Sequence, residues 1–123
     1  MVKRVAGGVT LERAGTGTPV VAGANVHVGD TVRTAADGAV GITMADDTLL
    51  TLGADSELVL SAYDFDSTTH DGSMLASLWR GTVAVVTGLI GKKTPDKMRV
   101  QTRTVVLGVR GTEFIVDAGK VAR

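Results

Sequence analysis

Turn-forming residues recur at short intervals along the chain, and this spacing limits the fold more than any other feature of the sequence. Glycine accounts for 16 of the 123 residues, and Gly or Asp marks each turn. The turn signals are Gly15-Thr16-Gly17, Gly23-Ala24-Asn25, Gly29-Asp30, Asp37-Gly38, Asp46-Asp47 and Gly53-Ala54-Asp55. Turns that are about 8 to 12 residues apart, or closer, are typical of all-β domains. No interval between them suits a long helix.

The segments between the turns alternate in polarity, as half-buried strands do. Val40, Ile42 and Met44 fall on one face of such a strand, and the residues between them fall on the other. The strands expected on this basis are 9–13, 20–21, 31–34, 39–44, 49–52, 57–60, 74–78, 82–87, 99–102, 104–107 and 113–117. Two polar loops, 63–73 and 88–98, interrupt them. The sequence predicts an all-β fold of stacked hairpins, in a twisted β-sandwich or short β-solenoid, with little or no helix.

Length and charge restrict the function classes. A chain of 123 residues is expected to form a single domain over 1–123, with a core built from aliphatic residues because only 3% of residues are aromatic. Thirteen basic residues balance thirteen acidic ones. Such a chain has no long-range field to attract nucleic acid or an anionic membrane, so neither is expected as a partner.

The absence of cysteine removes disulfides, thiolate catalysis and cysteine-rich zinc sites. No run of about 18 apolar residues is present, so no transmembrane segment is expected in this chain. The start Met1-Val2-Lys3-Arg4 is basic, but Ala6-Gly7-Gly8 interrupts any apolar signal core. For an exported protein we therefore expect that the signal sequence has been removed and that Met1 is a cloning start.

A glycine-flanked segment near the C-terminus is the most distinctive part of the sequence. It reads Gly108-Val109-Arg110-Gly111-Thr112-Glu113-Phe114 and lies between two apolar strand candidates. Glycines at both ends of a short turn allow positive φ or close approach of two backbones. Arg110 supplies a fork of donors and Glu113 a carboxylate, so with Thr112 they can close a hydrogen-bonded network across the bend. We expect this network to be structural, with Phe114 anchoring the following strand.

This segment resembles the signature of the FecR domain family. Further matches are Gly29-Asp30-Thr31-Val32-Arg33-Thr34, Ala45-Asp46-Asp47-Thr48-Leu49-Leu50-Thr51-Leu52 with Ser56-Glu57-Leu58, and Arg80-Gly81-Thr82-Val83. They occur in the family's order over roughly residues 26 to 117. The resemblance implies a β module that faces the bacterial envelope, periplasmic or secreted, and that is often part of a larger signalling or surface protein.

The chain departs from the family pattern in two respects. Asp47 stands where the family usually has Gly, which affects the expected geometry of that turn. The family members that regulate an iron-responsive sigma factor carry a cytoplasmic helical segment and a membrane helix before this domain, and neither is present in this sequence. Sigma-factor control is therefore not carried over to this chain.

The sequence gives little support for a catalytic or metal-binding motif. Asp64, Asp66, His70 and Asp71 are clustered as hard-cation ligands often are, but Thr69 sits where a calcium loop requires Gly, so a solvated loop is favoured. Residues 88–94 only superficially resemble a phosphate-binding loop, since Val86 and Lys93 occupy positions that need Gly and a hydroxyl. Serine-nucleophile motifs are absent. The expectation is no catalytic residue, no metal site and no cofactor.

Trp79, with its neighbour Arg80, is the candidate interface, because tryptophan is enriched among binding hot spots. The favoured function is recognition of a protein partner in the bacterial envelope, through an exposed edge strand that accepts a strand from that partner. The alternatives are a glycan or cell-wall binding module that uses Trp79 and the loop 64–71, and a structural spacer in a larger envelope protein. The sequence leaves the oligomeric state open.

The structural interpretation of the signature segment can be tested with Arg110→Ala. Removing the guanidinium breaks the expected network, so the variant should melt at a lower temperature than the parent, while any binding surface stays intact. Thermal unfolding followed by circular dichroism measures the difference. Equal melting temperatures would contradict the structural role.

Overall fold

One long strand, β8 (Gly72–Val86), organises the fold. The computed structural model describes residues 1–108 and 113–119 of the chain. The first half of β8 pairs with β7 (Glu57–Phe65) and with β9 (Met98–Gln101). Its second half pairs with β6 (Leu49–Leu52) and with β11 (Glu113–Gly119). The single strand therefore belongs to both halves of the sheet.

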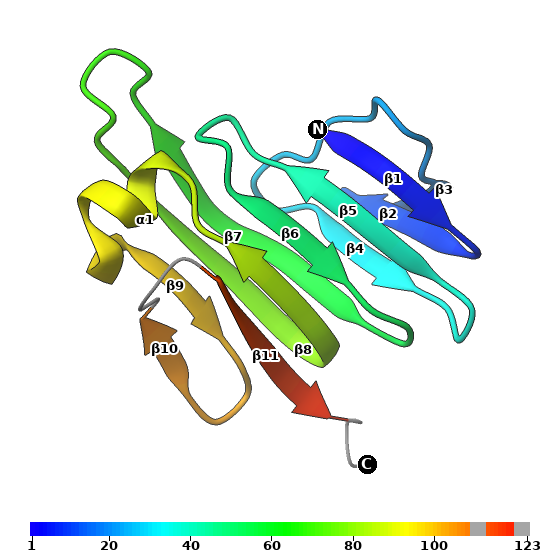
Figure 1. The fold of residues 1–123 in the computed structure, drawn as a ribbon. Coiled ribbons are helices and arrows are strands. Elements are labelled where there is room, and N and C mark those ends of the chain that lie inside the picture. Colours follow the sequence, from blue (N-terminus) through cyan, green and yellow to red (C-terminus); the bar gives the residue numbers. More distant parts are fainter. Residues whose placement is uncertain (109–112, 120–123) are drawn as a thin grey trace.

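The remaining elements extend the sheet on either side of this strand. They are β1 (Val2–Ala6), β2 (Val9–Arg13), β3 (Thr16–Pro19), β4 (Thr31–Thr34), β5 (Ala39–Thr43), β10 (Val106–Gly108), the short helix α1 (Leu89–Lys93) and the 3-10 turn η1 (Pro95–Lys97). The strand order is β1-β5-β6-β8-β7-β4-β2-β3, with β11 and the β9–β10 hairpin on the other flank of β8. Every pairing is antiparallel except that of β8 with β9. Figure 1 shows this arrangement.

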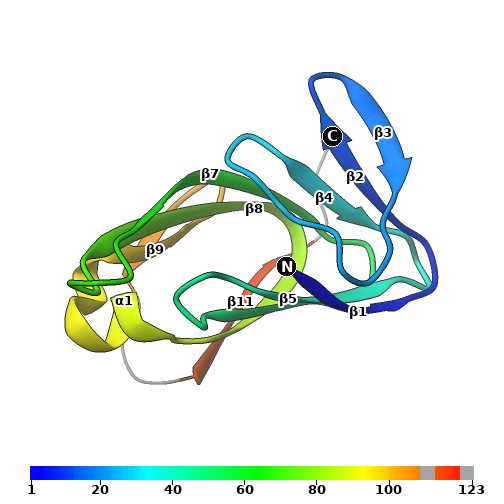
Figure 2. The same ribbon diagram turned by 90° about the horizontal axis from the view of Figure 1, so that it is seen from above.

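The sheet curls into a half-barrel (Figure 2). Its two parts fold over one another, and α1 lies at one end between them. Buried aliphatic side chains from both parts form one core. Fully buried members include Val40, Ile42, Leu50, Leu52, Met74, Leu78, Val83 and Val85. Burying apolar side chains of this size contributes about 1.5 to 3 kcal/mol each, and this term drives the curling.

A β-bulge and a glycine produce the bend in β8. Leu78 pairs with Leu58 and Arg80 with Glu57, so β8 has one extra residue at this step. The inward-facing residues are consequently even-numbered up to Leu78 and odd-numbered from Val83 onward. The bulge thus lets both halves of β8 present apolar side chains to the same core, although the strand changes direction.

Gly81 follows the bulge and has φ +82°, a conformation that favours glycine. A Cβ at this position would lie 2.1 Å from Ser56 Oγ and 2.6 Å from Ser56 Cα. The Ser56 hydroxyl accepts a hydrogen bond from the backbone N–H of Thr82 at 3.0 Å. The absence of a side chain at Gly81 therefore allows the turn that precedes β7 to pack against the bend.

A buried carboxylate attaches α1 to the sheet. Asp46, in the turn between β5 and β6, is fully buried. Its Oδ2 accepts hydrogen bonds from the Thr48 hydroxyl at 2.7 Å and from the N–H of Ile90 at 3.2 Å, and its Oδ1 accepts from the Tyr63 hydroxyl at 2.9 Å. Burial, and then the bond to Asp46, raises the pKa of Tyr63 above its usual range. The turn, β7 and the start of α1 are fixed to one another by this group.

The all-β prediction with little helix is confirmed. Its finer form needs correction, because the strands make one curled half-barrel in place of a sandwich or a solenoid. The expected strands 74–78 and 82–87 are one strand, since the bulge bends β8 without ending it. Strand 20–21 is not formed. The loop expected over 88–98 contains α1 and η1.

We predict that Gly81→Ala lowers the free energy of unfolding by about 3 kcal/mol or more, because it combines an unfavourable φ with a clash against backbone. Gly15→Ala is the matched control, since Gly15 has φ +81° but nothing within 4 Å of the added Cβ. The control should lose only about 1 kcal/mol. Urea unfolding of both variants measures the losses, and equal losses would show that the close packing at Ser56 does not constrain the bend.

Candidate interaction surface

Trp79 lies at the bulge of β8, in a groove between the β9–β10 hairpin and β11. The groove encloses about 380 Å³. Arg103 and Val105 line it from the turn between β9 and β10, Leu107 from β10, and Ile115 from β11. The groove forms because β9 runs beside the first half of β8 and β11 beside the second half, so the bend separates them. Its position follows directly from the fold.

The Arg103 guanidinium lies over the indole ring of Trp79, 5.5 Å from the ring centroid. This is cation–π geometry, which stabilises an exposed pair by about 0.5 to 1 kcal/mol. Trp79 is half-buried. Arg80, which the sequence analysis grouped with Trp79 in one interface, does not line the groove, because its Nε donates to the backbone carbonyl of Asp55 at 3.1 Å. The structure therefore separates the two residues that the sequence proposed as one interface.

Large apolar side chains are exposed around the groove. The exposed fractions are 71% for Ile115, 45% for Val105 and 39% for Leu107. Ile115 lies between Phe114 and Val116, which pack into or against the core, so its side chain is on the outer face of β11. Sequence reasoning missed this residue. An apolar side chain at a position where a half-buried strand should be polar was the signal that could have identified it.

The four edge strands of the described residues differ in how they discourage pairing. The edge strand β1 carries Lys3 and Arg4, and β3 is four residues long and ends in Pro19. Charge, shortness and proline are the usual means of protecting an edge. In contrast, β11 is seven residues long with Ile115 exposed, and β10 exposes apolar side chains. β11 also carries two exposed charges, Glu113 and Asp117, so among the described residues its length and its exposed Ile115 are what distinguish this edge.

The signature pair Gly29 and Asp30 enters β4 through a tightly bonded turn. Gly29 has φ +92°, and Asp30 is 1% exposed. Arg13 Nε donates to Asp30 Oδ1 at 2.8 Å and Arg13 Nη2 to Oδ2 at 2.6 Å, while the N–H of His27 donates to Oδ2 at 2.7 Å. These bonds, led by that from Arg13, hold the pKa of Asp30 below its usual range. The pair holds β2 and the β4 turn together, and its bonding partners Arg13 and His27 line a cavity of about 290 Å³ that is separate from the Trp79 groove.

The rest of the signature lies around β10 and β11. Gly108 ends β10, and Glu113 begins β11 with an exposed side chain. Phe114 is half-buried and packs against the core. Arg110, Gly111 and Thr112 lie outside the described residues, so the expected network between Arg110 and Glu113 stays a prediction. The signature thus joins the two strands that flank the Trp79 groove.

The polar loop does not gather its side chains around one point. Asp66 Oδ1 accepts from the N–H groups of Thr68 and Thr69, Asp71 pairs with Lys93 at 2.8 Å, and His70 stacks on Phe65. Among the residues that the structure describes, no three possible metal ligands come together. In that same part of the chain, no helix is long and apolar enough to cross a membrane.

Comparison with known proteins gives one match. A family model described as FecR protein matches residues 30–122, which includes β4 to β11 and the groove. Neither the curated proteins nor the solved structures contain a significant match.

The Arg13–Asp30 pair predicts a pH-dependent stability. Since the pKa of Asp30 is lower in the folded than in the unfolded chain, the pair is fully stabilising above about pH 4 and loses this effect as the pH falls through the folded-state pKa. Asp30→Asn should lower the free energy of unfolding at pH 7 by about 2 kcal/mol. The difference from the parent should shrink toward pH 2.

Chemical unfolding of both proteins between about pH 2 and 7 measures this dependence. Asp96→Asn serves as the control, because Asp96 is exposed and its stability effect should be small at every pH. A loss for Asp30→Asn that is constant with pH would contradict the assignment.

Proposed function

The chain belongs to the FecR family, and from that premise we propose that it is a non-catalytic, periplasmic or secreted module that binds a protein partner in the bacterial envelope. Family membership implies a signalling-related regulatory module associated with the envelope. The more specific part of the proposal is that the module binds a protein partner, either in a protein–protein interaction or in signal perception. This part rests on the surface around Trp79.

The long edge of β11, with Ile115 exposed, is the observation that supports this proposal most. A seven-residue edge strand presents main-chain N–H and C=O groups along its free side, and another extended chain can pair with them. Soluble proteins usually protect such an edge, as β1 and β3 are protected here. Ile115, which is exposed beside the groove between the acidic residues Glu113 and Asp117, offers an apolar contact to a chain that pairs with this edge.

The occupant that fits is an extended segment of another protein with alternating apolar residues. Its backbone would continue the sheet beyond β11, and its apolar side chains would pack against Ile115 and into the groove at Trp79 and Leu107. Arg103 has no carboxylate partner among the described residues, so an acidic residue in the segment would find a cation at the groove. Main-chain bonds supply affinity and the groove supplies selectivity.

Glycan binding is less well supported. The indole face of Trp79 on which a sugar could stack is covered by Arg103. The polar loop ends where β8 begins at Gly72, so Trp79 lies seven residues further along the strand, a distance of about 23 Å at the usual rise. The two parts of the glycan site expected from the sequence are therefore apart, the loop at the start of β8 and Trp79 at its middle.

The proposal is tested with Ile115→Lys, which places a charge on the edge strand at an exposed position. The purified domain is used to capture proteins from the envelope fraction of the source organism, and the purified complex is then analysed by amide hydrogen exchange. We expect the partner to slow exchange within residues 113–119, and we expect Ile115→Lys to weaken capture at least tenfold.

Thr51→Lys is the matched control. Thr51 is exposed and lies in the same cross-strand row as Ile115, but on the central strand β6. It should leave capture unchanged. The proposal fails if the partner protects other surfaces only, or if both variants reduce capture equally.

A further inference from the structure

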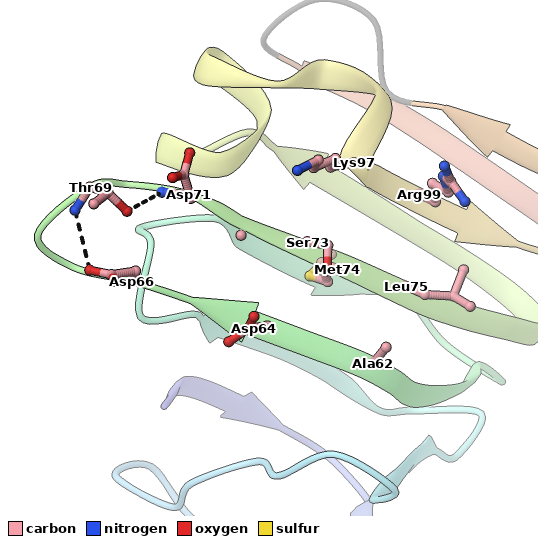
Figure 3. Close-up of a pocket in the computed structure, with 11 residues that line it drawn as sticks. Ala62, Asp64, Asp66, Thr69, Asp71, Ser73, Met74, Leu75, Lys97 and Arg99 are labelled. Carbon is pink, nitrogen blue, oxygen red and sulfur yellow. Dashed lines mark hydrogen bonds between the residues drawn. The ribbon is translucent and has the colours of Figure 1, made fainter.

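A second groove lies on the outer face of β7, β8 and β9, at the start of β8 (Figure 3). It encloses about 680 Å³. Ala62 and Asp64 line it from β7, Ser73 and Leu75 from β8, Lys97 from the end of η1 and Arg99 from β9. This surface is distinct from the β11 edge and goes beyond the function proposed above.

The strand register separates the charges of the groove into two sides. Asp64 pairs with Ser73, and the parallel pairing of Met74 with Met98 places Lys97 beside Ser73. The next row consists of Ala62, Leu75 and Arg99. Figure 3 shows the carboxylate of Asp64 on one side of β8, and Lys97 and Arg99 on the other. An apolar floor, Ala62 and Leu75, lies between a negative and a positive side.

These charges are not neutralised within the described residues. The ion pairs found there involve neither Asp64, Lys97 nor Arg99. Two further acids line the groove: Asp66 accepts from the N–H groups of Thr68 and Thr69, and Asp71 is paired with Lys93 at 2.8 Å. Lys97 also lies near enough to Asp71 to contribute to the lowered pKa of that carboxyl, after the larger effect of Lys93. Arg99 donates from Nε to the backbone carbonyl of Asp96, which leaves its terminal nitrogens without an acidic partner. The groove therefore offers an acceptor and two cations to a ligand of opposite polarity.

We propose that this groove binds a short free peptide through both of its termini, with the terminal ammonium at Asp64 and the terminal carboxylate at Lys97 and Arg99. Neighbouring strands are about 4.8 Å apart, so the backbone positions of Asp64 and Lys97 are separated by about 9.6 Å. An extended dipeptide spans about 7 Å. The side chains of Asp64 and Lys97 close the remaining gap.

The same geometry favours a dipeptide over a single amino acid. The ammonium and carboxylate of a single amino acid are about one residue length apart, roughly 3.5 Å, so the side chains of Asp64 and Lys97 must close a gap of about 6 Å in place of about 3 Å. A peptide of two residues also places its side chains over Ala62 and Leu75. Length and terminal charge, and not side-chain identity, are the features that the groove selects.

The probe is alanyl-alanine, titrated into isotope-labelled domain at low salt and followed by NMR. We expect a Kd of about 1 mM, with shifts centred on Ser73, Leu75 and Arg99. Alanine alone, and alanyl-alanine with an acetylated amino terminus and an amidated carboxyl terminus, should bind at least about tenfold more weakly.

The variants Asp64→Asn and Lys97→Gln should each weaken binding about tenfold. Asp47→Asn and Lys92→Gln are the matched controls, because both residues are exposed and lie outside the groove, and they should bind as the parent does. No binding up to about 10 mM, equal binding of the blocked peptide, or shifts confined to other surfaces would overturn the proposal.

Discussion

The bend of β8 at Gly81 is the constraint from which the rest of the architecture follows. A straight strand of 15 residues would hold its neighbours in one open sheet with an uncovered apolar face. The bulge before Gly81 changes which residues face inward, and the glycine permits the approach of Ser56. Both halves of the sheet can then enclose one core. The same bend separates β9 from β11 and so opens the groove at Trp79.

Buried polar groups fix the turns that the curled sheet requires. Asp46 joins the β5–β6 turn to Tyr63 and to the first residues of α1, and Asp30 joins the turn before β4 to Arg13 on β2. Each carboxylate is almost fully buried and is supplied with several donors, which offsets the cost of removing its charge from water. Both positions belong to the motifs that resemble the FecR family, so these motifs describe turn chemistry.

The strands were predictable where polarity alternates along the sequence. The predictions failed where pairing with distant strands determines whether a segment is a strand or a turn. Val40 and Ile42 alternate regularly, and their strand is present as expected. The segment Trp79-Arg80-Gly81 looks like a turn, but pairing on both flanks of β8 keeps it in one bent strand. The burial of Asp46 could not be foreseen either, because its donors Tyr63 and Ile90 are distant in sequence.

For the surfaces, sequence could identify single residues but not their neighbours. Trp79 was a candidate on composition alone, whereas the groove also needs Leu107 and Ile115 from strands that only the bend brings beside it. Arg80 was a candidate by adjacency, and its side chain instead bonds to the turn at Asp55. The charged groove of β7 to β9 depends on register across three strands, which no local pattern contains.

The most direct test of this account is the amide hydrogen exchange of the free domain, residue by residue, along β11. If the bend leaves this strand as an open edge, amides that point toward β8 should exchange slowly and those that alternate with them should exchange rapidly, as expected of a strand paired on one side only. Uniform protection of residues 113–119 in the free domain would show that the edge is already covered, and would contradict the account.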